Sequence, residues 1–298
     1  MTLTVATTLT DALEGLAAGA RPIAGGTDLV VGARQGKAPL PDTLIAIDRL
    51  DELAVIDRND ATTRIGSGVT HARLMTDPTI VDHFTSLSDA AALVGSPATR
   101  NVGTLGGNVM NGSPAMDTGA PLVVLGATAE LASTSGTRTV SLDELWTGPG
   151  TTAASNDELC TALLVPNPAP HSASAYVRLE YRRAMEIAVV GAAAAVTLDG
   201  DTIAAVRVAL TAVAPTIIEV DQLDAVVGRE PNDETLASVA DLAAEQASPI
   251  SDLRASDKYR RHTIGVMARR AVDAAARRAA GEAIAVPVNR SLGIGAAQ

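Results

Sequence analysis

A strand, a glycine turn and a helix follow one another near the start of the chain. Apolar residues at helical spacing predict a helix at about residues 10–18, and a short apolar run predicts a strand at residues 21–24. Gly25-Gly26 interrupts the pattern, and a second helical run begins near Leu29, which Thr27 or Asp28 could cap. This alternation of strands and helices is typical of an α/β fold.

A proline cluster divides the rest of the chain. Residues 96–111 combine turn-forming residue types with hardly any periodicity, which predicts an ordered loop. An apolar segment follows at residues 120–127. Residues 166–170 contain three prolines, and we place a domain boundary there. Short strands are predicted before this boundary at residues 44–47, 62–67, 129–133, 137–141 and 159–165.

Beyond the boundary, the pattern predicts a small antiparallel sheet with helices. Residues 192–198 and 202–210 flank Asp199-Gly200, a pair that favours the positive φ angles of a tight hairpin turn. Two helices are predicted at residues 233–247 and 256–281, and the longer one carries apolar residues near helical spacing. We expect the tail after Pro287 to be loosely ordered.

The composition narrows the class of protein. No run approaches the roughly 20 apolar residues of a membrane span, and no basic segment precedes an apolar one at the N-terminus, so we expect a soluble cytoplasmic protein. The formal net charge of −11 argues against nucleic-acid binding. The single cysteine, Cys160, excludes an internal disulfide and any iron–sulfur or zinc site built on several local cysteines. Any metal centre would therefore lie on another chain.

Two glycine-rich segments could bind a diphosphate through backbone N–H groups, because glycines let the backbone approach an anion closely. The first segment alone is more typical of a plain strand–helix turn. Two such segments, however, can hold one diphosphate from opposite sides. The first comprises Ala24, Gly25, Gly26, Thr27 and Asp28, and the second comprises Thr104, Leu105, Gly106, Gly107 and Asn108.

Other nucleotide-binding motifs are incomplete. The run from Gly66 to His71 has two glycines of G-x-G-x-x-G but lacks the third, and residues 32–38 are one residue short of a P-loop and lack its Ser/Thr. These runs do not support Rossmann or Walker chemistry. The histidines show no metal-ligand spacing, and we expect them at the surface or at helix caps: His71, His83, His171 and His262.

Three segments together resemble the FAD-binding medium subunit of the molybdenum hydroxylases, the family that includes carbon monoxide dehydrogenase and xanthine dehydrogenase. They are Gly-Gly-Thr-Asp at residues 25–28, Thr-Arg-Asn-Val-Gly-Thr-Leu-Gly-Gly-Asn at residues 99–108, and Ser-Pro-Ala-Met-Asp at residues 113–117. The similarity extends through residues 182–190 and 252–262, so it spans nearly the whole chain.

The resemblance implies an α+β fold like that of the vanillyl-alcohol-oxidase and MurB flavoproteins. Two α/β FAD-binding subdomains, at about residues 1–55 and 56–168, would form a PCMH-type domain. A C-terminal domain at residues 169–285, with a three-stranded antiparallel sheet and helices, would follow, and residues 286–298 would form a tail.

The resemblance also implies roles for individual residues. The two glycine-rich segments would hold the pyrophosphate of FAD, and Asp117 would lie near the ribityl and isoalloxazine parts. Leu164 would approach the ring edge through backbone atoms. Arg178 would contact the flavin at a position where family members commonly carry Lys.

As an oxidoreductase component, the chain would be the electron-transfer subunit of a heterotrimer that forms dimers. Electrons would leave the substrate at a molybdopterin centre on a large subunit, cross [2Fe-2S] clusters on a small subunit and reach FAD here, from which an external acceptor would take them. We expect neither a catalytic side chain nor a metal site in this chain. Two alternatives stay open: a self-contained FAD-dependent oxidase, and a non-enzymatic structural subunit that binds FAD. The substrate and the acceptor also stay open, because the substrate pocket would lie on another chain.

Overall fold

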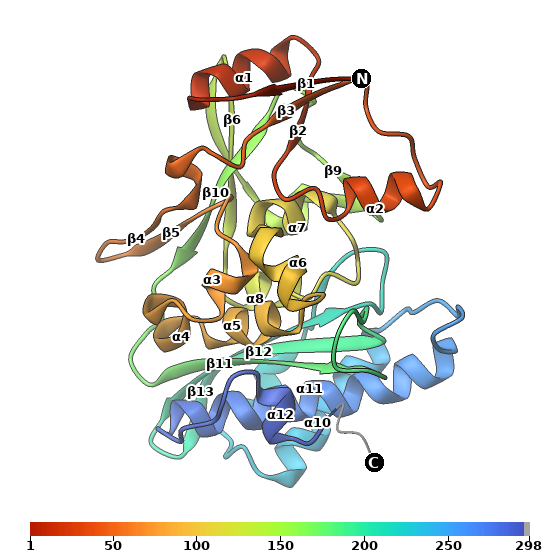
Figure 1. Ribbon diagram of the computed structural model, residues 1–298. Helices are drawn as coiled ribbons and strands as arrows, with labels where there is room; N and C mark the ends of the chain where they lie inside the picture. Colours follow the sequence, from red (N-terminus) through yellow and green to blue (C-terminus); the bar gives the residue numbers. More distant parts are fainter. Residues whose placement is uncertain (295–298) are drawn as a thin grey trace.

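The computed structural model describes residues 1–294 and arranges them in three stacked parts (Figure 1). A three-stranded sheet forms one end, a five-stranded sheet with short helices forms the middle, and a second antiparallel sheet with long helices forms the other end. Among these residues, no helix combines the length and the apolar character needed to cross a membrane.

The N-terminal part is a parallel sheet in the order β1-β3-β2. Helix α1 begins where predicted because Thr8 and Asp11 cap it reciprocally, each side chain accepting a hydrogen bond from the other residue's N–H. Asp28 is the N-cap residue of α2, one of the two positions predicted, but its side chain makes no capping hydrogen bond. The elements are β1 (Thr2–Val5), α1 (Leu9–Ala17), β2 (Arg21–Ile23), α2 (Leu29–Arg34) and β3 (Thr43–Ala46).

The middle part is a five-stranded antiparallel sheet in the order β4-β5-β10-β6-β7. A 3₁₀ helix (Asp51–Ala54) leads into it, and α9 (Leu142–Leu145), β8 (Trp146–Gly148) and β9 (Thr151–Thr152) lie between β7 and β10. Its strands are β4 (Ile56–Arg58), β5 (Thr62–Gly66), β6 (Thr128–Ser133), β7 (Gly136–Ser141) and β10 (Leu159–Pro166).

Six short helices connect β5 to β6, and they replace the loop expected at residues 96–111. The turn-forming residues there are helix caps: the Ser96 and Thr104 side chains accept from the N–H groups of Thr99 and Gly107, and Gly112 ends its helix at φ 62°. The helices are α3 (His71–Leu74), α4 (Pro78–His83), α5 (Thr85–Leu93), α6 (Pro97–Val102), α7 (Leu105–Asn111) and α8 (Gly119–Val124).

The C-terminal sheet has four strands rather than three, because the two-residue strand β14 pairs with β13 at its edge. The predicted hairpin at Asp199-Gly200 is present, with Gly200 at φ 58°. The elements are β11 (Ser172–Leu179), β12 (Val190–Asp199), β13 (Thr202–Thr211), β14 (Ile218–Glu219), a 3₁₀ helix (Leu223–Val226), α10 (Asp233–Gln246), α11 (Asp257–Ala279) and α12 (Val288–Ser291).

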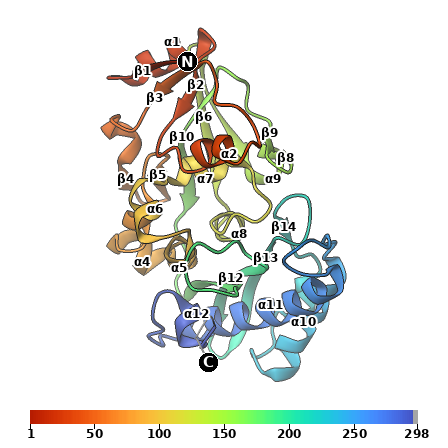
Figure 2. The same cartoon turned by 45° about the vertical axis from the view of Figure 1, so that its right-hand side comes forward.

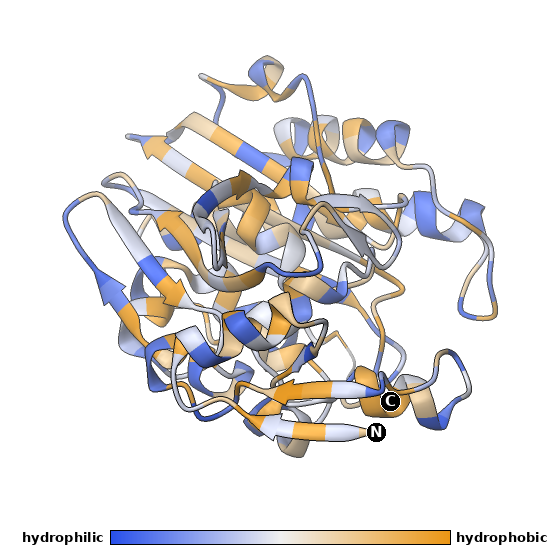
Figure 3. Ribbon diagram, turned by 90° about the horizontal axis from the view of Figure 1, so that it is seen from above, coloured by the Kyte–Doolittle hydropathy of each residue, from blue (hydrophilic) through white to orange (hydrophobic). Residues whose placement is uncertain are grey.

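Strand β12 is covered on both faces, with α11 on one side and α8 on the other, and α5 packs on the neighbouring strand β11. Its residues are therefore apolar on both faces: Ala192 and Ala194 pack with the α11 core, and Ala193 packs with the core of the middle part. Seen from above, apolar colouring follows the strands while the hairpin ends and outer loops are hydrophilic (Figure 3).

Hydrogen bonds of Asp89 join the C-terminal part to the middle part, and those of Asn289 hold the last helix against the C-terminal sheet. Both oxygens of the buried Asp89 on α5 accept hydrogen bonds from Arg278 of α11, at 2.6 and 3.1 Å, and also from the N–H groups of Tyr176 and Val288. The side chain of Asn289 pairs with both backbone groups of Arg178 in β11. The expectation of a loose tail was therefore wrong for residues 288–291, and residues 295–298 lie outside the described part of the chain.

Candidate functional site

The first glycine turn presents unused backbone donors. Strand β2 ends at Ile23, and Gly26 adopts φ 65°, which glycine reaches without steric cost. Within residues 1–294, the N–H groups of Gly25, Gly26, Thr27 and Asp28 donate to no protein acceptor. The turn is partly exposed, so these four consecutive donors are available to an anion.

The turn lies directly against the junction of α6 and α7. A Cβ atom on Gly25 would stand 1.9 Å from the Val102 carbonyl oxygen, so only glycine permits this approach. Figures 1 and 2 both show α2, which follows the turn, beside α7. The two glycine-rich segments predicted to act together are thus neighbours.

The second segment has already used its donors. The N–H of Leu105 donates to Val69 and that of Gly106 to Ser67, at 2.9 and 2.8 Å. The N–H of Gly107 donates to the Thr104 hydroxyl and that of Asn108 to the Thr104 carbonyl. The exposed Gly107 and the side chain of Asn108, whose oxygen accepts from Thr118 at 2.6 Å, remain on the open side of α7.

A third segment, residues 67–71 after β5, completes the site. Besides accepting from Leu105 and Gly106, it pairs through the His71 N–H with the Gly103 carbonyl at 3.0 Å. Two of its buried polar atoms, Ser67 Oγ and His71 Nδ1, have no hydrogen-bond partner among the described residues. A ligand or a water molecule can complete the bonding of such groups.

His71 is neutral at physiological pH. Burial, together with the positive charge of Arg100, lowers the pKa of His71 to about 4. A neutral imidazole offers one donor and one acceptor. The expectation that this histidine lies at the surface was wrong, because its side chain is buried, with its ring next to Gly103.

Asp117 and Arg178 meet in a buried network at the junction of the two domains. The Asp117 carboxylate accepts from Arg178 at 2.7 Å and from the Tyr176 hydroxyl at 2.8 Å. Every guanidinium nitrogen of Arg178 donates to Asp117, Glu180 or the Glu186 carbonyl. The carboxylates hold the pKa of Arg178 above its usual range despite the opposing effect of burial. Arg178 has no exposed surface, and all its side-chain nitrogens are engaged within the protein.

Leu164, which was expected to approach the ring edge through backbone atoms, belongs to the five-stranded sheet of the middle part. Leu164 lies within the central strand β10, flanked by Arg64 of β5 and Thr128 of β6. Its neighbours Leu163 and Val165 face the core of the middle part, so its side chain takes the opposite face of the sheet.

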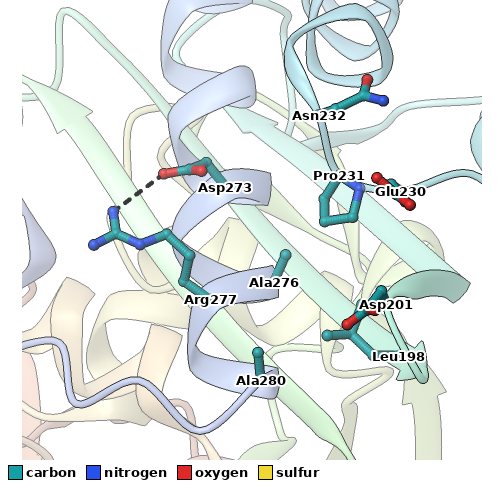
Figure 4. Close-up of a pocket in the computed structure, with 9 residues that line it drawn as sticks. All are labelled: Leu198, Asp201, Glu230, Pro231, Asn232, Asp273, Ala276, Arg277 and Ala280. Carbon is teal, nitrogen blue, oxygen red and sulfur yellow. Dashed lines mark hydrogen bonds and ion pairs between the residues drawn. The ribbon is translucent and has the colours of Figure 1, made fainter.

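The residues at the turns fit a diphosphate. They supply four N–H groups that bond no described acceptor and a close backbone approach at Gly25. A hollow of about 290 Å³ elsewhere, between α11 and the β12–β13 hairpin, is acidic, with Asp201, Glu230 and Asp273 in its wall (Figure 4). Its Arg277 is already paired with Asp273 and Glu282, so this hollow repels a diphosphate.

Sequence reasoning missed four residues that build the site: Ser67, His71, Tyr176 and Glu180. The glycines at 66 and 68 were a signal for this segment, because a Cβ atom at either position would stand within 3.0 Å of the Leu53 carbonyl oxygen, so only glycine fits there. Tyr176 had no local signal, since its partner Asp117 lies 59 residues away.

Two family models match the chain. The FAD binding domain in molybdopterin dehydrogenase matches residues 1–168. The CO dehydrogenase flavoprotein C-terminal domain matches residues 175–275.

Individual relatives are similar over most of their length. The xanthine dehydrogenase FAD-binding subunit of Escherichia coli O157:H7 is 32% identical over 282 residues, 93% of this chain and 96% of that protein. The carbon monoxide dehydrogenase medium chain of Hydrogenophaga pseudoflava is 31% identical over 264 residues, 88% of this chain and 91% of that protein.

Solved structures agree. Carbon monoxide dehydrogenase from Hydrogenophaga pseudoflava matches with a TM-score of 0.88 at 30% identity, covering 93% of this chain and 97% of that one. Quinoline 2-oxidoreductase from Pseudomonas putida 86 matches with the same TM-score at 29% identity, covering 94% and 98%.

Proposed function

Because the chain belongs to the family of FAD-binding medium subunits of the molybdenum hydroxylases, we propose that it is the electron-transfer subunit of a heterotrimeric enzyme of this kind. Bound FAD supplies the redox chemistry, receiving electrons from iron–sulfur clusters on a partner subunit and giving them to an external acceptor. The observation that carries the proposal is the similarity over 93% of this chain and 96% of a xanthine dehydrogenase FAD-binding subunit.

The chain's own part is to hold and orient the cofactor. We assign the diphosphate to residues 24–28 and 104–108, where the free N–H groups of the first turn donate to its oxygens and the exposed face of Gly107 allows close contact. Asn108 retains an amide N–H₂ for a ribose or ribityl hydroxyl, because its oxygen is the atom that Thr118 binds.

Asp117 and Arg178 contribute indirectly. Thr118, next to Asp117, anchors Asn108, while Asp117 itself is fixed by Tyr176 and Arg178 of the C-terminal sheet. The network thereby holds the second segment and the C-terminal domain in one arrangement around the cofactor. We keep Leu164 as a backbone contact at the ring edge of the flavin, and we propose that Arg178, whose side chain has no exposed surface, acts by fixing Asp117.

The proposed partners are a molybdopterin-binding large subunit and a [2Fe-2S] small subunit, assembled as a dimer of heterotrimers. The name of the Hydrogenophaga relative, a medium chain of carbon monoxide dehydrogenase, supports an assembly of several chains. Residues 1–294 supply a diphosphate site but no group of three or more His, Cys, Asp or Glu side chains arranged for a metal.

Co-purification with the products of neighbouring genes tests the proposal. The expected complex contains flavin, iron and molybdenum, and its flavin absorption bleaches when the iron–sulfur clusters are reduced anaerobically. Flavin without metals, with turnover of an organic substrate by the purified chain alone, would instead establish a self-contained oxidase. A flavin that stays oxidised while the clusters are reduced would show a structural subunit.

A further inference from the structure

A small hollow lies where α12 meets the ends of α5 and β11. Its volume is about 110 Å³, and its wall includes Ala92 of α5, Glu180 just after β11 and Asn289 of α12. Two arginines line the same hollow: Arg183, from the loop between β11 and β12, and Arg290, on α12. Because a water molecule takes about 30 Å³ in the liquid, this arginine-lined hollow has room for an anion of a few non-hydrogen atoms.

The single carboxylate in the wall already has a partner. Glu180 is only 7% exposed, and its Oε2 accepts hydrogen bonds from both Nε and Nη2 of Arg178. Within residues 1–294, the Arg290 side chain makes no hydrogen bond or ion pair. The hollow therefore offers positive charge that Glu180 does not neutralise.

Positive charge extends beyond the wall. The pKa of Arg100 on α6 is lowered, first by burial and then by the positive charges of Arg290 and Arg178. Several arginines thus lie within electrostatic range of one another in a chain whose formal net charge is −11. An anion bound among them would reduce their mutual repulsion.

The backbone that carries Arg290 is held in place before any ligand binds. Asn289 is only 1% exposed, and its side chain pairs with the N–H and the carbonyl of Arg178 at 3.0 and 2.8 Å. These two bonds fix α12 against β11. Less backbone freedom is then lost when an anion binds.

We propose that the arginine-lined hollow binds an oxyanion of the phosphate class, either inorganic phosphate or the phosphate group of a larger ligand. The planar guanidinium groups of arginine match the oxygen atoms of phosphate and donate charge-assisted hydrogen bonds to them. This site is additional to the one that we assign to the diphosphate of FAD. It adjoins Glu180 and Arg178, so a bound anion lies next to the network that fixes Asp117.

Isothermal titration calorimetry of the full-length chain with inorganic phosphate tests the proposal. FAD is present at saturation and the ionic strength is held constant with chloride. We expect a Kd of about 1 mM or lower, and Arg290→Gln should raise it at least about tenfold, since it removes a charged donor. Arg229→Gln is the matched control: it makes the same change of charge at an exposed arginine outside the hollow, and it should leave the Kd unchanged.

Filling the hollow separates a built site from general attraction to a basic surface. Ala92→Leu adds volume to the wall without changing the charge, so it should also raise the Kd at least about tenfold. Should Ala92→Leu not fold, Arg183→Gln must raise the Kd as Arg290→Gln does. A parallel titration with AMP identifies the source of the phosphate: tighter binding of AMP indicates a larger ligand, and tighter binding of inorganic phosphate indicates the free ion.

Three results would overturn the proposal: no binding of either ligand by the wild type, an equal loss in Arg229→Gln and Arg290→Gln, or an unchanged Kd in a folded Ala92→Leu. Repeating the titration without FAD keeps this test independent of the cofactor. Phosphate that binds only when FAD is absent would belong to the glycine turns and would also contradict the proposal. A chain that binds phosphate in the hollow but does not bind FAD would refute the proposed function alone.

Discussion

The two glycine-rich segments look alike in sequence but differ in what they offer a ligand. The first keeps four consecutive N–H groups free, whereas the second spends the N–H groups of residues 105–108 on Ser67, Val69 and Thr104. The N–H groups of the second segment are thus bonded within the protein, whereas those of the first segment are free to bind an anion. Gly25 and Gly106 both allow close packing of the backbone, but only the first turn also has free N–H groups.

Gly25→Ala should have the largest effect on FAD binding. The new Cβ would meet the Val102 carbonyl oxygen at 1.9 Å, which forces the first turn away from α6 and α7. We expect the Kd of FAD to rise more than about 100-fold, equivalent to at least about 2.7 kcal/mol. Gly32→Ala is the control, because that position in α2 has open space around it and alanine favours a helix. Equal FAD affinity in the two variants would contradict the arrangement.

Lowering the pH should reduce the folding stability of the chain through the buried His71. Its pKa of about 4 lies below the ordinary 6.5, so the unfolded chain takes up the proton first as pH falls. This group's contribution to stability is therefore complete above about pH 6.5 and is lost progressively down to about pH 4, by up to about 3 kcal/mol.

Denaturant unfolding near pH 7 and near pH 4.5 measures this loss. His71→Leu should lose less stability than the wild type over that interval, because no imidazole remains to be protonated. Identical pH dependence in the two proteins would show that the His71 pKa is not depressed.

Gly106→Ala tests the packing of the second segment against residues 67–69. Its Cβ would stand 2.4 Å from Ser67 Cβ, so we expect about 2 kcal/mol of lost stability as α7 is pushed from residues 67–69. Gly107→Ala, on the exposed face, should lower stability little but weaken FAD binding about tenfold by blocking close approach. Thermal unfolding and FAD titration of both variants separate these effects. A loss of stability in Gly107→Ala together with a loss of FAD affinity in a stable Gly106→Ala would contradict the roles given to the two glycines.

Thr104→Val should have the smallest effect. It removes the hydroxyl that accepts from the Gly107 N–H and caps α7, at a cost of about 1 kcal/mol. The substitution also frees the Gly107 N–H, which can then donate to the cofactor. The loss of FAD binding free energy should therefore be smaller than the loss of folding free energy. A large loss of FAD binding at unchanged stability would mean that the Thr104 side chain contacts the cofactor itself.

Local patterns predicted eight of the strands, the Asp199-Gly200 hairpin and the two long helices, since each depends on nearby residues, but they missed others, including β1, β4 and β11. The helices at residues 97–111 were not predicted, because they are too short to show a helical period of apolar residues. Their capping residues, Ser96 and Thr104, are also residue types that are common in turns. The neighbouring positions of Gly25 and Val102 could be anticipated only from the family resemblance. The buried network of Asp117, Tyr176 and Arg178 is set by pairing between distant segments, which no local pattern encodes.

Amide hydrogen exchange with and without FAD tests the central claim most directly. In the flavin-free chain, the amides of residues 25–28 should exchange fast and those of residues 105–108 slowly, because only the latter are hydrogen-bonded. FAD should strongly slow exchange at residues 25–28 and change residues 105–108 little. Protection that appears at residues 105–108 while residues 25–28 continue to exchange fast would contradict the account.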